Sequence, residues 1–145
     1  MIWDARSGLS TATYIGHQHA VLSACTSVSG YDAYSVDASG CLIHWDLRHI
    51  QQRSTSSVDP THMIALHDVS LSASSTLASA LVATAAEDGI VRVHQPSYSA
   101  NGSHESMSVV AELSGHDGRV DCVRWDPHGQ YLVSGGADGS FRVWS

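Results

Sequence analysis

The stretch GHDGRVDCVRWDPHGQYLVSGGADGSFRVWS, residues 115–145, decides the fold of this chain. Apolar and polar residues largely alternate in 120–125 and again in 140–144. Such alternation is typical of strands that bury one face. Between them, 126–129 and 137–139 are turn sequences, because proline presets φ and glycine accepts φ > 0. Three short strands joined by tight turns are therefore predicted within this stretch.

The same pattern recurs along the chain. Shifting the sequence by 99 places residues 16–45 over residues 115–144 without a gap, with eight identities in thirty positions. The identical residues of the earlier copy are Gly16, His17, Val21, Gly30, Ser35, Ala38, Gly40 and Trp45. A shift of 50 gives a copy between them, led by His67 and carrying His94 at the tryptophan position. A partial copy ends at Trp3. Repeats of this period indicate stacked supersecondary units.

Each repeat is predicted to add a fourth strand, near residues 11–15, 62–66 and 108–113. We interpret residues 50–59 and 96–105 as insertions that lengthen two loops. Residues 70–86 are rich in Ala, Leu and Ser and, taken alone, have the pattern of an amphipathic helix. The repeat register favours strands there, because it places Thr84 and Asp88 at strand and turn positions.

Charge and composition exclude several classes of function. The chain carries 7 basic and 14 acidic residues, a formal charge of −7, with no cationic stripe. Binding nucleic acid or an anionic membrane surface requires clustered Lys and Arg, so we expect neither partner. The chain does not open with a basic segment followed by an apolar run, and it contains no apolar stretch of about 18 residues. We therefore expect a cytoplasmic or nuclear protein.

Cysteines and histidines are present without the spacing of a metal site. Cys25, Cys41 and Cys122 form no CxxC pair and are odd in number, so we interpret them as small buried thiols. His17 and His19 are two residues apart, with no Cys or carboxylate at ligand spacing. We therefore expect no metal and no cofactor.

Gly-His, about thirty further residues, and a strand ending in Trp-Asp together resemble the WD-repeat family of β-propellers. In that family four antiparallel strands form a blade, and about seven blades ring a channel. The resemblance implies an all-β fold, a partial β-propeller of about three and a half four-stranded blades. Its repeats are expected at residues 1–15, 16–66, 67–113 and 114–145. Because the chain begins at a third strand and ends after one, we expect the C-terminal part of a propeller.

His116, Ser134 and Asp138 have the chemistry of a nucleophilic catalyst, in which His takes the serine proton and Asp orients His. However, the set recurs with the repeat, and active sites are not normally repeated. The resemblance implies instead a structural hydrogen-bonded chain inside each blade, which satisfies buried polar groups. Its expected members are His116, Ser134, Asp138 and Trp144, then His17, Ser35 and Trp45, then Thr84 and Asp88. In the copy that contains His17, Ser39 replaces the turn aspartate, although Asp37 lies two residues earlier.

A non-catalytic protein-interaction scaffold is the predicted function, because a rigid propeller offers several loop surfaces to other proteins. A narrower alternative rests on Trp-Asp-x-Arg, present at residues 3–6 and 45–48. In the WD-repeat family this sequence resembles the motif by which substrate receptors of cullin–RING ubiquitin ligases dock on the ligase adaptor. Arg6 and Arg48 are then the candidate partner-binding residues. An enzyme is the third alternative, with only the repeated His/Ser/Asp set in its favour.

Overall fold

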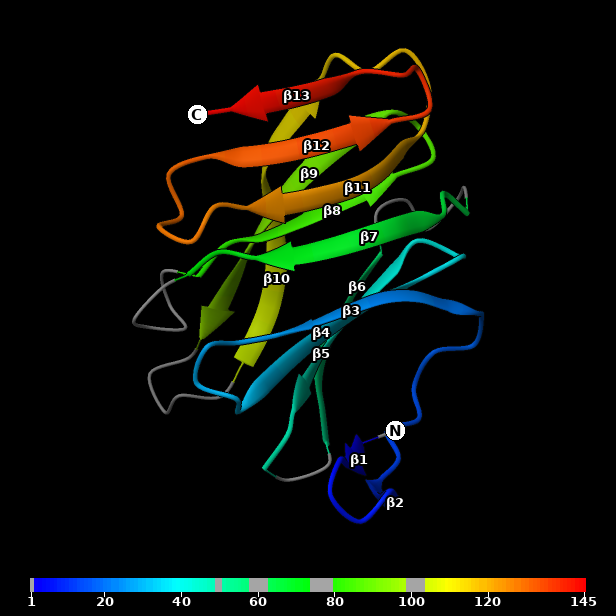
Figure 1. Cartoon of the computed structure of the whole chain (residues 1–145), viewed down its shortest axis with the longest axis vertical. Helices are drawn as coiled ribbons and strands as arrows, with labels where there is room; N and C mark the ends of the chain where they lie inside the picture. Colours follow the sequence, from blue (N-terminus) through cyan, green and yellow to red (C-terminus); the bar gives the residue numbers. More distant parts are fainter. Residues whose placement is uncertain (1, 49–50, 58–62, 74–79, 99–103) are drawn as a thin grey trace.

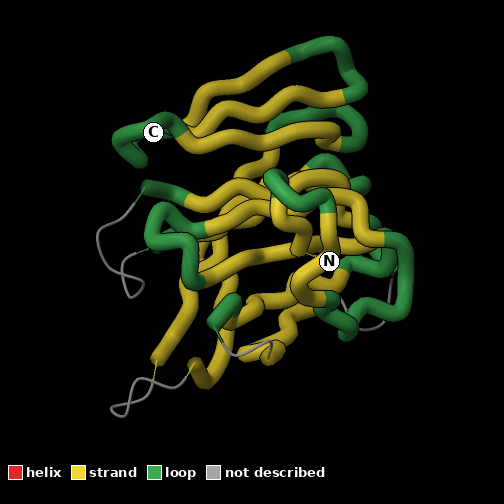
Figure 2. Tube along the Cα trace, turned by 60° about the horizontal axis from the view of Figure 1, so that its bottom comes forward, coloured by secondary structure: helices red, strands yellow, loops and turns green. Residues whose placement is uncertain are grey.

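The computed structural model describes the chain except residues 1, 49–50, 58–62, 74–79 and 99–103. The described residues form antiparallel β-sheets joined by loops, and they contain no helix (Figure 2). The part of the chain that the structure describes therefore has no helix able to cross a membrane. The all-β class predicted from the alternating pattern is confirmed.

Three sheets form the body of the molecule, and we call them the first, second and third blade (Figure 1). The first blade contains β3 (Val21–Thr26), β4 (Asp32–Asp37), β5 (Cys41–Asp46) and β6 (Gln51–Ser57). The second contains β7 (Leu66–Leu71), β8 (Val82–Ala86), β9 (Ile90–Tyr98) and β10 (His104–Ser114). The third contains β11 (Val120–Trp125), β12 (Leu132–Gly136) and β13 (Phe141–Trp144). A hairpin of β1 (Ile2–Asp4) and β2 (Leu9–Ala12) precedes them. Because consecutive strands pair in every sheet, each blade is an antiparallel meander.

The blades stack face to face, with their first strands β3, β7 and β11 side by side (Figure 1). Side chains alternate between the two faces of a strand, so Tyr34 and Val36 join Leu66 in the core between the first two blades. A second core lies between the second and third blades, where Val91 and Val123 meet. This stack of meanders confirms the predicted partial β-propeller.

Glycine is required for two separate reasons at the ends of the β4–β5 and β8–β9 turns. Gly40 and Gly89 have φ of 88° and 80°, a region that other residues rarely adopt. A Cβ on Gly40 would also lie 2.6 Å from the carbonyl oxygen of Ile64, and one on Gly89 would lie 2.8 Å from that of Gly118. Both clashes are with the backbone leading into the next blade. Close stacking of blades thus explains why a glycine recurs at this turn in the sequence.

Three expectations about the positions of strands and loops are wrong. The outer strand of the first blade is β6, at 51–57, and not at residues 62–66, of which residue 62 lies outside the described part. Residues 50–59 are therefore largely strand, and Leu66 already opens β7. Residues 96–105 are also not a long loop, because β9 continues to Tyr98 and β10 starts at His104.

The second blade contains the strands that the repeat register favours over a helix. β7 and β8 occupy the two ends of residues 70–86, and residues 74–79 lie outside the described part. His67 is not the leading histidine of this repeat, because it lies within β7, where its Nε2 is 2.5 Å from Oε2 of Glu87. The pairing Leu66–Ala86 in the second blade matches the pairing Val120–Gly136 in the third. In the third blade the leading histidine stands four residues before Val120. By the same count the leading position of the second blade is residue 62, which lies outside the described part.

All three cysteines are free thiols, but they are not all buried. Burial raises the pKa of the Cys25 thiol to about 12. Cys122, by contrast, is exposed, which corrects the prediction of a buried thiol. It lies on the face of the third blade that points away from the second.

Candidate functional site

The third blade holds an unbroken hydrogen-bonded chain across its three strands. Nδ1 of His116 lies 3.1 Å from Oδ2 of Asp138, and its Nε2 lies 2.8 Å from Oγ of Ser134. The indole N–H of Trp144 donates to the same hydroxyl at 3.0 Å. The backbone N–H of Asp117, and then the groups of Ser140, hold the pKa of Asp138 well below its usual range. Asp138 therefore accepts a hydrogen bond from Nδ1 of His116. This leaves Nε2 of His116 to accept a hydrogen bond from the Ser134 hydroxyl.

The first blade repeats this chain with its aspartate at another position. Nε2 of His17 lies 2.6 Å from Oγ of Ser35, and the N–H of Trp45 donates to that oxygen at 2.7 Å. The carboxylate comes from Asp37, whose Oδ2 lies 2.7 Å from Nδ1 of His17. The repeat register alone missed Asp37, because it assigns this role to Ser39. The neighbouring carboxylate in the sequence was the only signal.

The second blade keeps only part of the chain. Oγ1 of Thr84 shares a 3.0 Å hydrogen bond with Nε2 of His94, which stands where the other blades have tryptophan. Burial, and then the nearby Arg92, lower the pKa of His94 to about 4, so its ring is neutral at pH 7. Asp88 accepts two hydrogen bonds from Arg92, and the described residues place no histidine beside it. Glu112 binds the same guanidinium at 2.8 Å.

Asp68 links all three blades, and no repeat pattern pointed to it. Its Oδ1 accepts from the hydroxyl of Ser23 in the first blade at 2.7 Å. Its Oδ2 accepts from the backbone N–H of Val123 in the third blade at 3.0 Å and from the Arg124 guanidinium. This carboxylate therefore ties β3, β7 and β11 together. Its partners lie 45 to 56 residues away in sequence.

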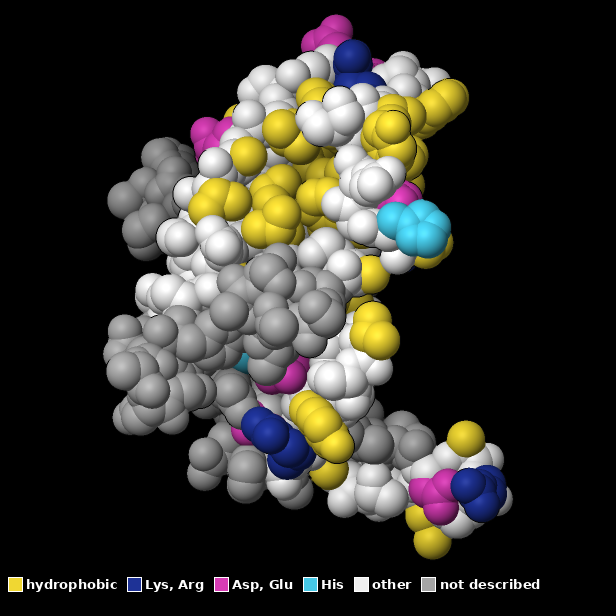
Figure 3. Space-filling model, turned by 90° about the vertical axis from the view of Figure 1, so that its left-hand side faces the viewer, with side chains coloured by type: hydrophobic (Ala, Val, Ile, Leu, Met, Phe, Trp, Pro, Cys, Tyr) yellow, Lys and Arg dark blue, Asp and Glu magenta, His cyan; other side chains and the backbone are white. Residues whose placement is uncertain are grey.

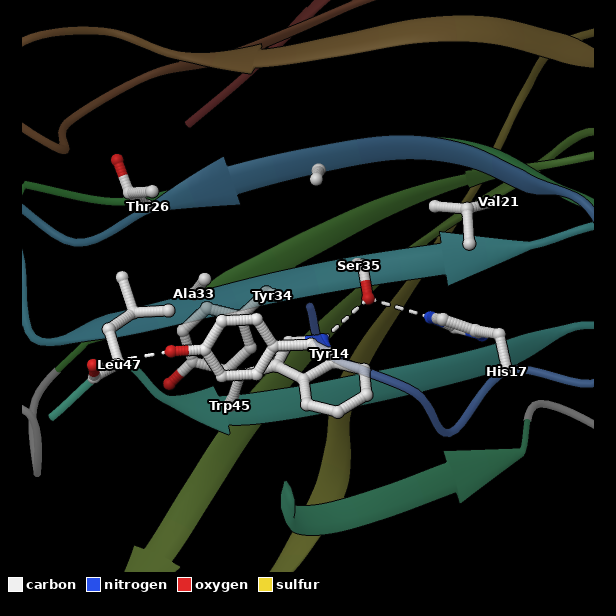
Figure 4. A pocket seen from close by; sticks show the side chains of 10 residues that line it. Tyr14, His17, Val21, Thr26, Ala33, Tyr34, Ser35, Trp45 and Leu47 are labelled. Carbon is white, nitrogen blue, oxygen red and sulfur yellow. Dashed lines mark hydrogen bonds between the residues drawn. The ribbon is translucent and has the colours of Figure 1, made fainter. Parts of the chain in front are cut away.

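A pocket of about 400 Å³ opens on the first blade, on the face turned away from the second (Figure 4). Tyr14 and Trp45 meet edge to face in its wall, with ring centroids 5.5 Å apart, and the Tyr14 hydroxyl donates to the carbonyl of Leu47. His17 lies toward one end of the pocket, and Ser35 stands between it and Trp45 (Figure 4). In the second and third blades the corresponding face is covered by the preceding blade.

The opposite open face belongs to the third blade. Val133 and Val143 are directly paired across β12 and β13, and Phe141 points to the same side. Phe141 is 75 % exposed and Val143 is 57 % exposed. Hydrophobic side chains also gather on the side of the molecule shown in Figure 3, at the level of the second and third blades, where charged side chains are few. The molecule thus presents an apolar sheet face at each end of the stack.

Arg6 and Arg48 lie in turns of the same local form. In each, the backbone N–H of the arginine donates to the aspartate two residues earlier, Asp4 or Asp46, at 2.9 Å. The Arg48 guanidinium also binds both oxygens of Asp46 and lies 5.2 Å from the centroid of the Tyr31 ring. The hydrogen bonds to Asp46, and then the negative charge of Asp46, raise the pKa of Arg48. Its side chain remains 45 % exposed.

Comparisons with known proteins agree with the geometry. The family described as "WD domain, G-beta repeat" matches residues 107–145. Ribosome biogenesis protein YTM1 of Chaetomium thermophilum is 30 % identical over 143 residues, covering 99 % of this chain and 25 % of that protein. WD repeat and FYVE domain-containing protein 1 of Homo sapiens is 46 % identical over 39 residues, covering 27 % of this chain and 10 % of that protein. The chain thus spans a quarter or less of these relatives.

Solved structures share this fold, and one of them illustrates the match. The crystal structure of RRP9 WD40 repeats matches with a TM-score of 0.72 at 15 % sequence identity. The match covers 90 % of this chain and 36 % of that one. At this identity the likeness concerns the fold alone.

Proposed function

Because the chain is a WD-repeat protein with the fold of part of a propeller, we propose that it is a scaffold that binds other proteins and catalyses no reaction. The observation that carries this proposal is the rigid stack of blades, in which internal hydrogen-bonded chains hold the strands and leave the connecting loops to meet partners. Within the described residues, the first blade bears the pocket walled by Tyr14 and Trp45, and the third exposes Phe141 and Val143. Apolar sheet faces of this kind bind protein surfaces.

The interior of the molecule supports the same conclusion. At both junctions between blades, the equivalent faces pack against a protein sheet through aliphatic side chains. The chain carries only 7 basic residues, so phosphate-rich ligands find few counter-charges. Sheets with internal hydrogen-bonded chains are rigid, and rigid surfaces lose little conformational entropy on binding.

The serines of the repeated set are poorly suited to catalysis. Ser134 is only 1 % exposed, and its hydroxyl oxygen accepts the indole N–H of Trp144. Oγ of Ser35 is engaged in the same way by Trp45. An indole N–H directed at the serine oxygen draws on the lone pairs that a nucleophile needs. The set therefore supports a structural role better than hydrolysis.

The scaffold proposal is tested by placing a charge on the third-blade face. Val143→Asp should remove a group of co-purifying proteins, identified by mass spectrometry, while the melting temperature stays near that of the wild type. Val28→Asp is the matched control, because Val28 is 84 % exposed in the turn between β3 and β4. If both variants retain every partner of the wild type, this face is not a binding surface. A hydrolytic activity that Ser35→Ala or Ser134→Ala abolished would contradict the non-catalytic proposal.

Ribosome assembly is the context we propose for these partners. The relative from Chaetomium thermophilum is named for ribosome biogenesis and matches almost the whole of this chain. A scaffold in such a complex would work in the nucleus or the cytoplasm. Tagged protein should then co-sediment with precursor ribosomal particles on a sucrose gradient. Recovery only in the light fractions would count against this context.

Docking on a ubiquitin ligase adaptor is a second candidate, favoured by the matching turns at Arg6 and Arg48. A guanidinium offers a planar pair of donors to a carboxylate on a partner. Arg48 would first exchange Asp46 for that partner, which costs little because the pair is partly exposed. Arg6→Ala/Arg48→Ala should abolish capture of the adaptor, whereas Arg119→Ala should not. Failure of the wild type to capture the adaptor would eliminate this candidate.

A further inference from the structure

Three different metal-ligand groups meet at one edge of the first blade. A ring nitrogen of His17, a carboxylate oxygen of Asp37 and Sγ of Cys41 all lie within 4.8 Å of one another, and Nδ1 of His17 is 2.7 Å from Oδ2 of Asp37. His17 precedes β3, Asp37 ends β4 and Cys41 begins β5, so the β4–β5 turn brings two of the groups to the third. The sequence spacing of the histidines did not reveal this cluster.

The third blade provides an internal comparison. Ser140 stands 99 residues after Cys41, at the corresponding place in the repeat. Its hydroxyl lies 3.3 Å from Nδ1 of His116 and 2.8 Å from Oδ1 of Asp138. A hydroxyl is therefore sufficient to complete the hydrogen-bonded chain at this position. The thiol of Cys41 adds a soft ligand beside a histidine and an aspartate that the fold already requires.

We propose that His17, Asp37 and Cys41 form a binding site for a divalent transition-metal ion, with Zn²⁺ as the ion of choice. Imidazole nitrogen, carboxylate oxygen and thiolate are the three ligand types that zinc takes in proteins. The thiolate disfavours Mg²⁺ and Ca²⁺, which prefer oxygen ligands. The ion binds the neutral imidazole of His17 at Nδ1, so the single ring proton is carried by Nε2, and the thiol proton of Cys41 passes to water. Three protein ligands leave the fourth position to water. This inference does not depend on the scaffold proposal.

The cluster reaches zinc geometry with small movements. Tetrahedral coordination places ligand atoms roughly 3.4–3.6 Å apart at the usual bond lengths. The His17–Asp37 pair, now 2.7 Å apart, opens by less than an ångström, and Sγ of Cys41, already within 4.8 Å of the other two ligand atoms, adjusts to the same spacing. Such displacements are within the reach of side-chain rotations.

The surroundings orient two of the ligands as metal sites require. Nε2 of His17 lies 2.6 Å from Oγ of Ser35, so the second ring nitrogen can donate there while Nδ1 faces the ion. Oδ1 of Asp37 accepts from the backbone N–H groups of Ser39 and Cys41 at 2.9 and 3.0 Å. Those bonds hold the carboxylate in place and leave Oδ2 for the ion.

Cobalt titration of the reduced 145-residue chain tests the site. Co²⁺ should bind at about one ion per chain and produce a thiolate-to-cobalt absorption band in the near ultraviolet, which Zn²⁺ then abolishes by displacement. Cys41→Ser should lose the band. That variant gives the first blade the serine found in the third, so it is expected to fold. Cys122→Ser is the matched control and should keep the band.

Thiol protection gives a second measurement that does not depend on the optical band. Bound Zn²⁺ should slow alkylation of Cys41 by iodoacetamide at least about tenfold, as followed by peptide mass spectrometry, and leave Cys122 unchanged. The proposal is overturned if the wild type shows neither the band nor protection. It is equally overturned if Cys41→Ser retains the band and Cys122→Ser loses it.

Discussion

Trp144 contributes both packing and a hydrogen bond to the third blade, and the two can be separated. Its ring packs against the core between the second and third blades, and its N–H donates to Ser134. Because the side chain is only half-buried, Trp144→Ala should lower the free energy of unfolding by about 2–3 kcal/mol, less than a fully buried aromatic. Trp144→Phe keeps most of the packing and should cost about 1 kcal/mol. Urea unfolding of both variants separates the two contributions, and a Trp144→Phe variant as stable as the wild type would show that the hydrogen bond contributes nothing.

His94 makes the stability of the second blade depend on pH. Its pKa falls from 6.5 in an unfolded chain to about 4 in the folded protein, mainly because it is buried. Below pH 6.5 the unfolded state takes up a proton that the folded state does not bind until about pH 4. Stability is therefore lost as the pH falls through this window, by about 3 kcal/mol in total.

The His94→Gln variant isolates this effect. Glutamine can still hydrogen-bond to Thr84, but it does not titrate. Urea midpoints measured between pH 7 and pH 4 should decline less steeply for the variant than for the wild type. Parallel declines would mean that His94 takes up its proton equally in both states.

Residues that repeat were the ones that sequence reasoning found. His116, Ser134, Asp138 and Trp144 share a pattern with an earlier copy, and the structure brings them together. The role of Asp37 could not be assigned by register, because a carboxylate two residues away reaches the same histidine by a different path. Side-chain reach, rather than position in the repeat, decides that contact.

At the scale of strands, Asp68 joins elements that no local pattern connects. Asp68→Ala removes the acceptor for Ser23, Val123 and Arg124 at once, and it leaves a backbone N–H buried without a partner. We expect a loss of about 3 kcal/mol in the free energy of unfolding. Asp121→Ala should cost about 0–1 kcal/mol, because Asp121 makes an exposed ion pair with Arg119. Similar melting curves for the two variants would contradict a linking role for Asp68.

Strand prediction succeeded where one face is buried and failed at the edge of a blade. β11 largely alternates apolar and polar residues because one of its faces contacts the second blade. β6 has the sequence Gln-Gln-Arg-Ser-Thr-Ser-Ser, with no apolar residue to signal a strand. It forms through backbone hydrogen bonds to β5, which leave no mark on the sequence. The longer β9 and β10 were shortened in the prediction for a related reason, since Pro96 and the polar residues after it are typical of a loop.

For the molecule as a whole, blade stacking is the contact that repeats. Each junction buries one face of a blade against the opposite face of the next, as Tyr34 with Leu66 and Val91 with Val123 illustrate. The two terminal faces of the stack expose apolar side chains of the kind that are buried at the junctions between blades. They are therefore complementary to each other, head to tail.

Self-association of the 145-residue chain follows from this complementarity. The third-blade face with Phe141 and Val143 should pack on the pocket face of the first blade in another copy, because both expose apolar surface to water. Light scattering after size-exclusion chromatography should give a mass that rises with protein concentration. Phe141→Ser should shift the distribution toward the monomer, whereas Val28→Ser, in an exposed turn, should not. A monodisperse monomer with a sharp, reversible melt would show that the terminal faces are stable in water and that stacking needs more than apolar surface.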